Sequence, residues 1–424
     1  MNSVVKQRIA DIQQGNVPAG YQKTKLGIIP ADWNVELLGS IFVARDERVD
    51  NSFDTPLFSL TIEDGITAKT ERYEREFLVK KEKNYKKVYS GDFVYNPMNL
   101  RFGAIARYHG NTPCSVSGYY DVFYLKNPSF YGDFIETLLQ SDILLKEYAN
   151  AATGSLIEKQ RVHFSNFCKI GFMQPNELEI TKIAKILGCC DRVIALKKEL
   201  IAEKKKQKKA LMQKLLNPNS GFRLPGFSGE WKTVKLKEVC DINTSSLSEN
   251  TNPDKSFYYL DLATVDKGKI VNEPAFVTFG NAPCRARRLF KKGDILFSTV
   301  RPYLRGFLFA DFVADDYVAS TGFAILTPQI GNIIGKLLYH HLFSDNIILQ
   351  TQNLLSGTNY PALNSYDVEN LYINIPKDIK EQQAIADILS AADKEIDLLE
   401  QELVQQEQKK KSLMQLLLTG IVRV

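Results

Sequence analysis

The sequence predicts an α+β fold. Two repeated modules of mixed α/β structure are separated by two long antiparallel helices that form a coiled coil, in a pseudo-two-fold arrangement. Two observations predict this fold: an internal repeat with a period of 202 residues, and a heptad spacing of apolar residues that occurs once in each repeat. The length of 424 residues agrees with it, because single hydrophobic cores rarely grow beyond about 250–300 residues.

The internal repeat is clearest in two helical segments. A shift of 202 residues places Ile183–Leu187 on Ile385–Leu389 and Lys208–Gln213 on Lys410–Gln415, and 14 of the 36 positions from 181 to 216 are identical. The same shift relates three features of the modules, with slips of up to four residues: Gly91–Tyr95 and Gly293–Phe297, Gly154-Ser155 and Gly357-Thr358, Trp33 and Trp231.

The repeat divides the chain into an N-terminal helical segment and two modules, each followed by a long helix: residues 1–17, 18–176, 177–217, 218–376 and 377–424. Ile12 and Gly15 lie two periods before Leu417 and Gly420, within a residue or two. The first segment therefore resembles the end of a preceding long helix. We expect the two chain termini to lie near one another.

Apolar residues in both helical segments recur at alternating steps of four and three, the spacing of a coiled-coil seam. Each helix should span about 35 residues, or roughly 50 Å at 1.5 Å per residue. The predicted helix-pairing residues are Ile183, Leu187, Ile194, Ile201, Leu211 and Leu215 in the first segment and Ile385, Leu389, Ile396, Leu399, Leu403, Leu413 and Leu417 in the second.

Charge predicts that the two helices run antiparallel. The window 182–214 holds 11 basic and 3 acidic residues, whereas 384–416 holds 4 and 7. In an antiparallel pair Asp191 faces Lys409, and a lysine run faces an acidic stretch; a parallel pair would juxtapose lysines. The facing residues are Lys204, Lys205, Lys206, Lys208 and Lys209 against Asp393, Glu395, Asp397, Glu400 and Glu402. The same lysines could alternatively grip phosphates, and the polar middle of the seam is either a register device or a docking surface.

Each module combines short β-rich runs with one predicted helix, over 134–148 in the first and 335–350 in the second. Basic, amide and aromatic residues follow the two Gly-Asp strands, and a second glycine-containing loop follows later in each module. Arginine suits both guanine edges and phosphate, so the arginine clusters favour nucleic acid as a partner over solvated loops. The second loop of each module either lies on the same face or is a plain turn. The candidate DNA-binding residues are Asn99, Arg101, Arg107, Tyr108 and Ser155 in the first module and Arg285, Arg287, Arg288, Arg301, Tyr303, Arg305, Thr358, Asn359 and Tyr360 in the second.

The sequence gives no support for chemistry within the chain. The six cysteines have no C-x-x-C spacing, and the four histidines lack the spacing of metal ligands. Tyr95–Met98 only partly matches the N-P-P-[YF] loop of adenine methyltransferases, and no Gly-rich cofactor loop precedes it. We therefore expect no catalytic residues, no metal and no cofactor. Without a signal-peptide pattern or a long apolar run, we expect a cytoplasmic protein that does not span a membrane.

Four segments carry a family resemblance. Pro18–Trp33 and Phe222–Trp231 resemble the opening segments of Type I restriction-modification specificity (S) subunits, and Gly293–Pro302 and Glu381–Leu389 are similar to further motifs of that family. The likeness covers nearly the whole chain, in this order and twice over. The first module departs from the pattern, because Asn96–Arg101 stands where the family has an arginine-proline step.

The resemblance implies that each module is a target-recognition domain that reads one half of a bipartite, asymmetric site in double-stranded DNA. It further implies that the helices set the unread spacer and dock two modification subunits, which methylate adenine, and that restriction (helicase-nuclease) subunits complete the complex. The alternatives are a non-catalytic two-module adaptor that binds RNA or protein, and a self-contained enzyme. Salt-dependent binding to one duplex sequence would separate the adaptor from the DNA reader.

Overall fold

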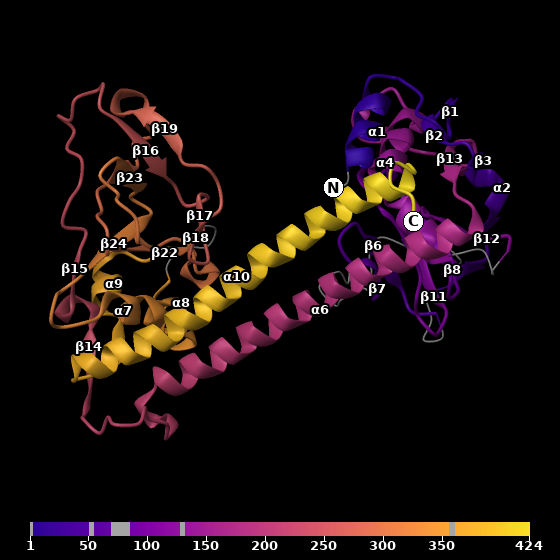
Figure 1. Cartoon of the computed structure of the whole chain (residues 1–424). Helices are drawn as coiled ribbons and strands as arrows, with labels where there is room; N and C mark the ends of the chain where they lie inside the picture. Colours follow the sequence, from indigo (N-terminus) through magenta and orange to yellow (C-terminus); the bar gives the residue numbers. More distant parts are fainter. Residues whose placement is uncertain (1–2, 51–54, 69–84, 128–131, 356–360) are drawn as a thin grey trace. The chain divides into compact units, whose positions relative to one another are not determined.

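The computed structural model describes residues 3–50, 55–68, 85–127, 132–355 and 361–424. The chain folds into two compact units (Figure 1), which are formed by Met1–Lys197 with Glu402–Val424 and by Lys198–Gln401. Each unit therefore contains one module together with part of each long helix. Among the described residues, no helix combines the length and apolarity needed to cross a membrane.

The two long helices are α6 (Glu177–Leu215) and α10 (Ile379–Leu418). The other elements of the first unit are α1 (Ser3–Gln13), β1 (Tyr21–Thr24), β2 (Gly27–Pro30), β3 (Asn34–Leu37), α2 (Leu38–Ile41), β4 (Phe42–Arg45), β5 (Arg48–Val49), β6 (Phe58–Thr61), β7 (Gly65–Ala68), β8 (Tyr85–Val88), β9 (Phe93–Tyr95), β10 (Ile105–Arg107), β11 (Cys114–Ser117), β12 (Asp121–Leu125), α3 (Gly132–Leu139), α4 (Asp142–Ala151), α5 (Phe164–Phe167) and β13 (Gly171–Gln174).

The second unit repeats much of this order. Its elements are β14 (Trp231–Lys235), β15 (Cys240–Ile242), β16 (Ser256–Leu260), β17 (Val265–Asp266), β18 (Lys269–Ile270), β19 (Ala275–Thr278), β20 (Ala286–Arg288), β21 (Ile295–Ser298), β22 (Phe307–Phe309), β23 (Tyr317–Ser320), β24 (Phe323–Pro328), α7 (Gly335–Leu342), α8 (Asp345–Leu354), α9 (Ser365–Asn370) and β25 (Tyr372–Pro376).

The central sheet has the same antiparallel strand order in both modules. It is β10-β9-β12-β4 in the first and β22-β21-β24-β15 in the second, so β9 corresponds to β21. A two-stranded sheet next to the long helix is also repeated, as β3-β13 and β14-β25. The modules differ in their remaining sheet, which is β11-β8-β5 in one and β19-β16-β23-β20 in the other. The mixed α/β prediction for both modules is confirmed.

The repeated Gly-Asp sequence builds the turn before β9 and β21. Gly91 and Gly293 adopt φ angles of +87° and +96°, a region that glycine enters without steric cost. The aspartate that follows accepts a hydrogen bond from a backbone N–H three residues earlier, at 2.9 Å in both modules: Tyr89 to Asp92 and Lys291 to Asp294. The motif is therefore a local turn device that starts the central strand.

The predicted single helix of each module is wrong in one respect, because both are broken in the middle. The first is split into α3 and α4, and the second into α7 and α8. A serine stands at each break. The hydroxyls of Ser141 and Ser344 accept the N–H of Leu144 and Ile347, so each serine caps a new helix.

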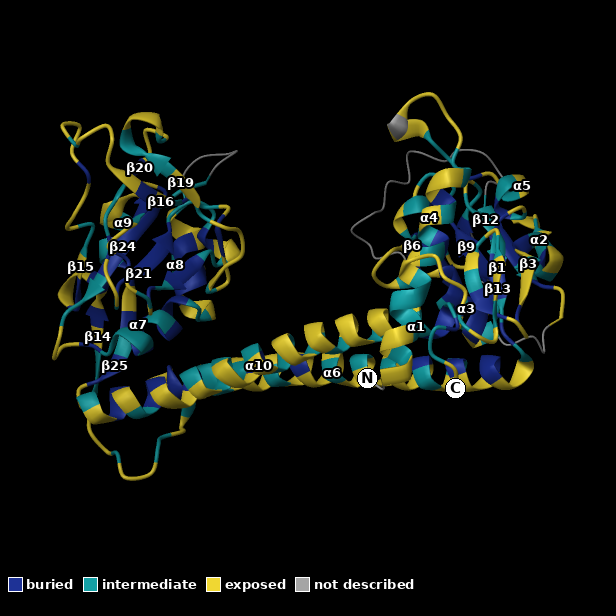
Figure 2. Ribbon diagram, turned by 45° about the horizontal axis from the view of Figure 1, so that its top comes forward, coloured by how far each residue is buried: buried dark blue, intermediate teal, exposed yellow. Residues whose placement is uncertain are grey.

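The core of each unit is completed by the beginning of one long helix and the end of the other (Figure 2). In the first unit Ile183 and Leu187 of α6 belong to the same buried cluster as Leu417 and Leu418 of α10. In the second, Ile385 and Leu389 of α10 join Leu215 and Leu216 of α6. The 202-residue shift interchanges these sets. The residues predicted to pair the helices are all buried or half-buried.

Ion pairs confirm the antiparallel direction within each unit. In the first unit Asp191 pairs with Lys410, and Lys197 with Glu402 at 2.6 Å. In the second unit Lys208 pairs with Asp393, and the Nζ atoms of Lys204 and Lys205 lie 2.6 and 2.8 Å from Glu395 and Glu400. The pairs Asp191–Lys410 and Asp393–Lys208 are equivalent under the repeat.

Three details of the predicted charge pairing are wrong. Asp191 is bonded to Lys410 rather than Lys409. Lys206 pairs with Glu203 of its own helix, since residues three apart are neighbours on a helical surface. Lys209 reaches Asp345 at the start of α8, 3.1 Å away. The repeat contains this last contact as well, because Lys411 pairs at 3.1 Å with Asp142 at the start of α4.

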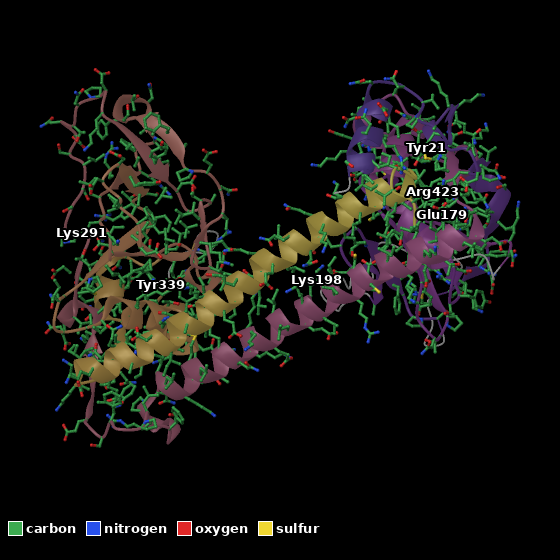
Figure 3. All side chains as sticks on the ribbon, in the orientation of Figure 1. Tyr21, Glu179, Lys198, Lys291, Tyr339 and Arg423 are labelled. Carbon is green, nitrogen blue, oxygen red and sulfur yellow. The ribbon has the colours of Figure 1, made fainter. Side chains whose placement is uncertain are left out.

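A buried carboxylate joins α6 to the end of the described chain. Glu179, which is 4% exposed, accepts hydrogen bonds from the guanidinium of Arg423 at 2.6 and 2.8 Å and from the indole of Trp33 at 2.6 Å. Burial alone would raise the pKa of Glu179, but the bonds from Arg423 and Trp33 outweigh burial and hold that pKa below its usual range. Figure 3 shows Glu179, Arg423 and Tyr21 close together.

The same region brings both ends of the described chain together, as expected. The hydroxyl of Tyr21 donates to the carbonyl of Gly420 at 2.6 Å, and Arg8 of α1 donates to that of Ile421 at 2.7 Å. The second unit contains an equivalent carboxylate, Glu381, which is 1% exposed and binds Arg223 through two bonds of 2.9 and 2.7 Å. An arginine that follows α6 thus binds the buried carboxylate of the second unit, as an arginine that follows α10 binds that of the first.

We expect Arg423→Ala to destabilise the first unit by about 2–3 kcal/mol, because Glu179 would remain buried without its cation. This value lies below that of a fully buried pair because a third of Arg423 is exposed. Since the folded pKa of Glu179 is depressed, the stabilisation is present above the unfolded pKa near 4.5 and is lost as the pH falls further. Hydrogen exchange resolved by unit measures the effect. Arg223→Ala is the matched variant for the second unit, and equal loss of protection in both units for either change would contradict this assignment.

Candidate nucleic-acid interface

A short 3₁₀ turn follows the central strand in both modules and has the same backbone hydrogen bonds in each, although its first residue is left-handed only in the second module. We call Asn99–Gly103 and Arg301–Arg305 the tip turns. The hydrogen bonds from the fourth residue to the first match: Phe102 N to Asn99 O and Leu304 N to Arg301 O are both 2.9 Å. The sites are related by the 202-residue shift, residue for residue.

The tip turn of the second module contains two non-glycine residues with left-handed backbone, which strains it. Arg301 and Arg305 have φ angles of +47° and +59°, and Gly103, which corresponds to Arg305, has +94°. A side chain in this region costs roughly 1–2 kcal/mol relative to glycine. Such strain is characteristic of functional loops, so the arginines at 301 and 305 mark this turn as a candidate site.

A second loop in each module is hydrogen-bonded to the backbone just before the tip turn. Val162 N donates to Pro97 O in the first module, and Leu363 N donates to Thr299 O in the second, both at 2.9 Å. Arg301 N also donates to Pro361 O at 2.9 Å. The two loops that the sequence singled out in each module therefore converge, as far as the described residues reach.

In the first module the tip turn exposes Asn99, while Arg101 is half-buried. Nη1 of Arg101 lies 2.6 Å from Oε1 of Gln160 in the second loop, and the guanidinium covers the ring of Phe102 at 4.7 Å. Ser155 of the second loop is exposed. Gln160 was not predicted: it lies 59 residues from Arg101, and no local pattern links the two positions.

The remaining candidates of the first module have structural partners. Arg107 pairs with Asp133 at 2.9 Å and stacks over Phe93. Tyr108 is 5% exposed, and its hydroxyl donates to Thr112 O at 2.8 Å. Burial raises the pKa of Tyr108 to about 12. The structure therefore gives Tyr108 a place in the core, which the sequence pattern of loop aromatics did not reveal.

In the second module the tip turn presents Arg301, Tyr303 and Arg305. Tyr303 is 40% exposed, and Arg301 is half-buried. The guanidinium of Arg305 is held by Asp345 at 2.8 Å, the same carboxylate that binds Lys209. Thr358, Asn359 and Tyr360 lie outside the described residues.

The arginines of β20 lie close to this turn. Thr299, just before the turn, donates to Gly322 O, and the neighbouring Thr321 donates to Arg285 O at 2.8 Å. Arg285 is exposed, and Arg287 stacks over Phe279 at 4.6 Å. Burial lowers the pKa of Arg288, whose Nη1 lies 3.3 Å from the hydroxyl of Ser246. Backbone hydrogen bonds thus connect the segment that begins at Arg285 with the residues just before the tip turn.

The polar groups at the tip turns and second loops favour binding of nucleic acid. Exposed amide, guanidinium, hydroxyl and phenol groups on rigid turns suit the edges of bases and phosphates. An open groove of about 660 Å³ beside β6, β7 and the first tip turn is lined by apolar side chains together with polar ones, among them Glu63, Asp64, His109 and Glu136. The hydrogen bond that His109 donates to the carboxylate of Glu136 raises the pKa of His109. Within the described ranges, no group of three His, Cys, Asp or Glu side chains could hold a metal ion.

Comparison with known proteins points to one family. The family model described as "Type I restriction modification DNA specificity domain" matches residues 228–408. Among curated relatives, the type I restriction enzyme MjaVIII specificity subunit of Methanocaldococcus jannaschii is 29% identical over 262 residues, 58% of this chain and 60% of that protein. The HindI specificity subunit of Haemophilus influenzae is 28% identical over 176 residues, 40% of this chain and 36% of that one. The match thus spans less than two thirds of either relative.

A third relative and two solved structures match over most of the chain. The putative MjaX specificity subunit of M. jannaschii is 24% identical, covering 95% of this chain and 97% of that protein. The fold is similar to the Type-I restriction-modification system S subunit from M. genitalium, with a TM-score of 0.57, 15% identity, and coverage of 91% and 96%. A structure from a study of assembly of the type I R-M system has a TM-score of 0.54 at 15% identity, covering 93% of this chain and 99% of that one.

The strain in the tip turns predicts opposite effects of two substitutions. Gly103→Ala should destabilise the first unit by about 1 kcal/mol through its backbone alone, since the added Cβ meets only ordinary contacts at 3.6 and 3.9 Å. Arg305→Gly should leave the second unit unchanged or more stable, because the released strain offsets one partly exposed ion pair. Unfolding followed by hydrogen exchange in each unit measures both. An Arg305→Gly variant with a markedly weaker second unit would show that the turn is not strained.

Proposed function

We propose that this chain, a member of the Type I restriction-modification specificity-subunit family, is the DNA-reading subunit of such a complex. Its domains are the recognition modules 18–176 and 218–376, with the segments 1–17, 177–217 and 377–424 forming the helical part. Each module reads one half of a bipartite duplex site through its tip turn and second loop. The observation that carries this proposal is the convergence of two loops at repeat-equivalent places, with Arg101 at the first and Arg301 and Arg305 at the second.

The two helices set the distance between the half-sites. A helix of 39 residues, such as α6, is about 58 Å long, more than the ~34–36 Å of one DNA turn. The bound half-sites then lie in successive turns of the groove, with the spacer unread between them. The ion pairs that orient α6 against α10 support a fixed helical register.

The partners are two modification subunits and the restriction subunits of the complex. The modification subunits dock on the long helices, where Leu196 of α6 and Leu398 of α10 expose 55% and 50% of their surface at repeat-equivalent positions. Methylation and cleavage belong to those partners, and this chain supplies specificity without a catalytic step or cofactor of its own. The complex works in the cytoplasm, where its DNA substrate lies.

Lengthening both helices tests the spacer role. Seven residues inserted into α6 after Lys197 and into α10 after Gln401 add about 10.5 Å, close to three base pairs, without changing the seam. We expect the selected target to keep both half-sites and to gain about three spacer base pairs, as read from duplexes bound by the chain in its complex. Insertion into one helix alone is the control and should abolish binding by shifting the register. Changed half-site letters would contradict the proposal.

Replacing 30–175 should change one half-site only.

A second test concerns base reading in the second module. Arg301→Ala should weaken specific binding roughly 10- to 100-fold and relax one position of one half-site, because a bidentate contact to guanine is lost. Arg305→Ala is the matched control, since Asp345 already holds that guanidinium, and we expect a smaller loss. Titration of labelled duplexes at two salt concentrations separates base contacts from phosphate contacts. Binding that ignores duplex sequence would instead favour the adaptor role.

A further inference from the structure

Both tip turns expose a large apolar side chain at the same position. Phe102 is 57% exposed and Leu304 55%, and the two are related by the 202-residue shift. Among the exposed large apolar residues of the described chain, only one other pair coincides under this shift, Leu196 and Leu398 on the long helices. Similar exposure at equivalent positions of two modules that differ in sequence indicates that these apolar side chains contact a partner.

The side chains are held in place by their backbone. Residues 102 and 304 are the last of a 3₁₀ turn, and the next residue in each turn donates to the first at 2.9 and 2.8 Å: Gly103 N to Leu100 O, and Arg305 N to Pro302 O. Two residues further on, Ile105 N and Phe307 N close onto Gly103 O and Arg305 O, at 2.8 Å in both modules. The turn therefore enters the next strand in one fixed geometry, and the apolar residue stays at its tip.

Neighbouring side chains reinforce this position in each module. The guanidinium of Arg101 covers one side of the Phe102 ring and is itself anchored to Gln160 at 2.6 Å. In the second module Tyr303 precedes Leu304, and Arg305, which follows it, is fixed by Asp345. Each apolar tip thus lies among polar groups that suit base edges, with Asn99 or Arg301 at the first position of the turn.

The chemistry of a DNA groove contains one apolar group that matches such a tip. In the major groove the base edges present hydrogen-bond donors and acceptors, and thymine alone adds a methyl group, at C5. Polar neighbours read the donors and acceptors, while an aliphatic or aromatic side chain gains energy only from the methyl. Docking of a protein on both tips would instead require a continuous apolar surface at each. Phe102 does border the groove beside β6 and β7, but Leu304 stands between Tyr303 and Arg305 in the chain, so the two tips do not share such a surface.

We infer that Phe102 and Leu304 read the 5-methyl group of a thymine, one in each half-site. The inference rests on the proposed function and deepens it, because it names the base feature that each tip recognises. Burying a methyl group changes affinity roughly three- to fourfold, so the two tips contribute specificity at single positions rather than the bulk of binding.

A thymine-to-deoxyuridine scan tests this directly, because deoxyuridine lacks only the 5-methyl group. Duplexes carrying one replacement at a time are titrated with the full chain in its complex with the modification subunits. We expect the wild-type complex to lose about three- to fourfold at one thymine in each half-site. Phe102→Ala should remove the sensitivity in one half-site only, and Leu304→Ala in the other. Phe102→Leu should retain it, since an apolar tip remains.

The outcomes are distinguishable. If the wild-type complex prefers a bipartite target but no deoxyuridine weakens binding, or if Phe102→Ala and Leu304→Ala keep the wild-type sensitivity, the inference fails and the proposed function stands. A half-site without an A·T pair overturns it likewise. If the wild-type complex shows no sequence preference at all, both fail. Each variant should keep the base preferences at the other positions of its own half-site, and this demonstrates that the substituted module is folded.

Discussion

The interaction on which the rest of the structure depends is the burial of the start of one long helix with the end of the other. Ile183 and Leu187 need Leu417 and Leu418 to close the core of the first unit, and the corresponding residues of the second unit do the same. Each core draws apolar residues from both long helices, which are far apart in the sequence. Burial of a helix end in a core fixes the rotation and the register of that end within its unit.

Charge decides direction where apolar contacts do not. The seam alternates four- and three-residue steps in either direction, so apolar spacing alone permits parallel pairing as well. The pairs Asp191–Lys410 and Asp393–Lys208 exist only in the antiparallel register. Each of these partly exposed pairs contributes modestly to stability, but a parallel arrangement would bring lysine runs together, and that repulsion makes the choice selective.

Much of the fold follows from the sequence because its signals are local or repeated. The heptad spacing predicted the buried side of α6 and α10, and the repeat predicted two modules with matching Gly-Asp strands. Breaks at Ser141 and Ser344 were missed because a capping serine inside an apolar run gives only a weak signal beside the periodicity around it. The bond between Arg101 and Gln160 and the burial of Glu179 depend on contacts between distant segments. Composition and spacing carry no information about such contacts, and for that reason candidate loops could be predicted but not their convergence.

The order in which the chain is made has a consequence for the first unit. Residues 198–401 form the second unit without help from outside that range, whereas the first unit needs 402–424 to cover its core and to neutralise Glu179. On a ribosome adding roughly 5–20 residues each second, the first module waits roughly ten to fifty seconds for that segment. During this time its apolar surface stays open, and the module made first becomes the one to finish folding last.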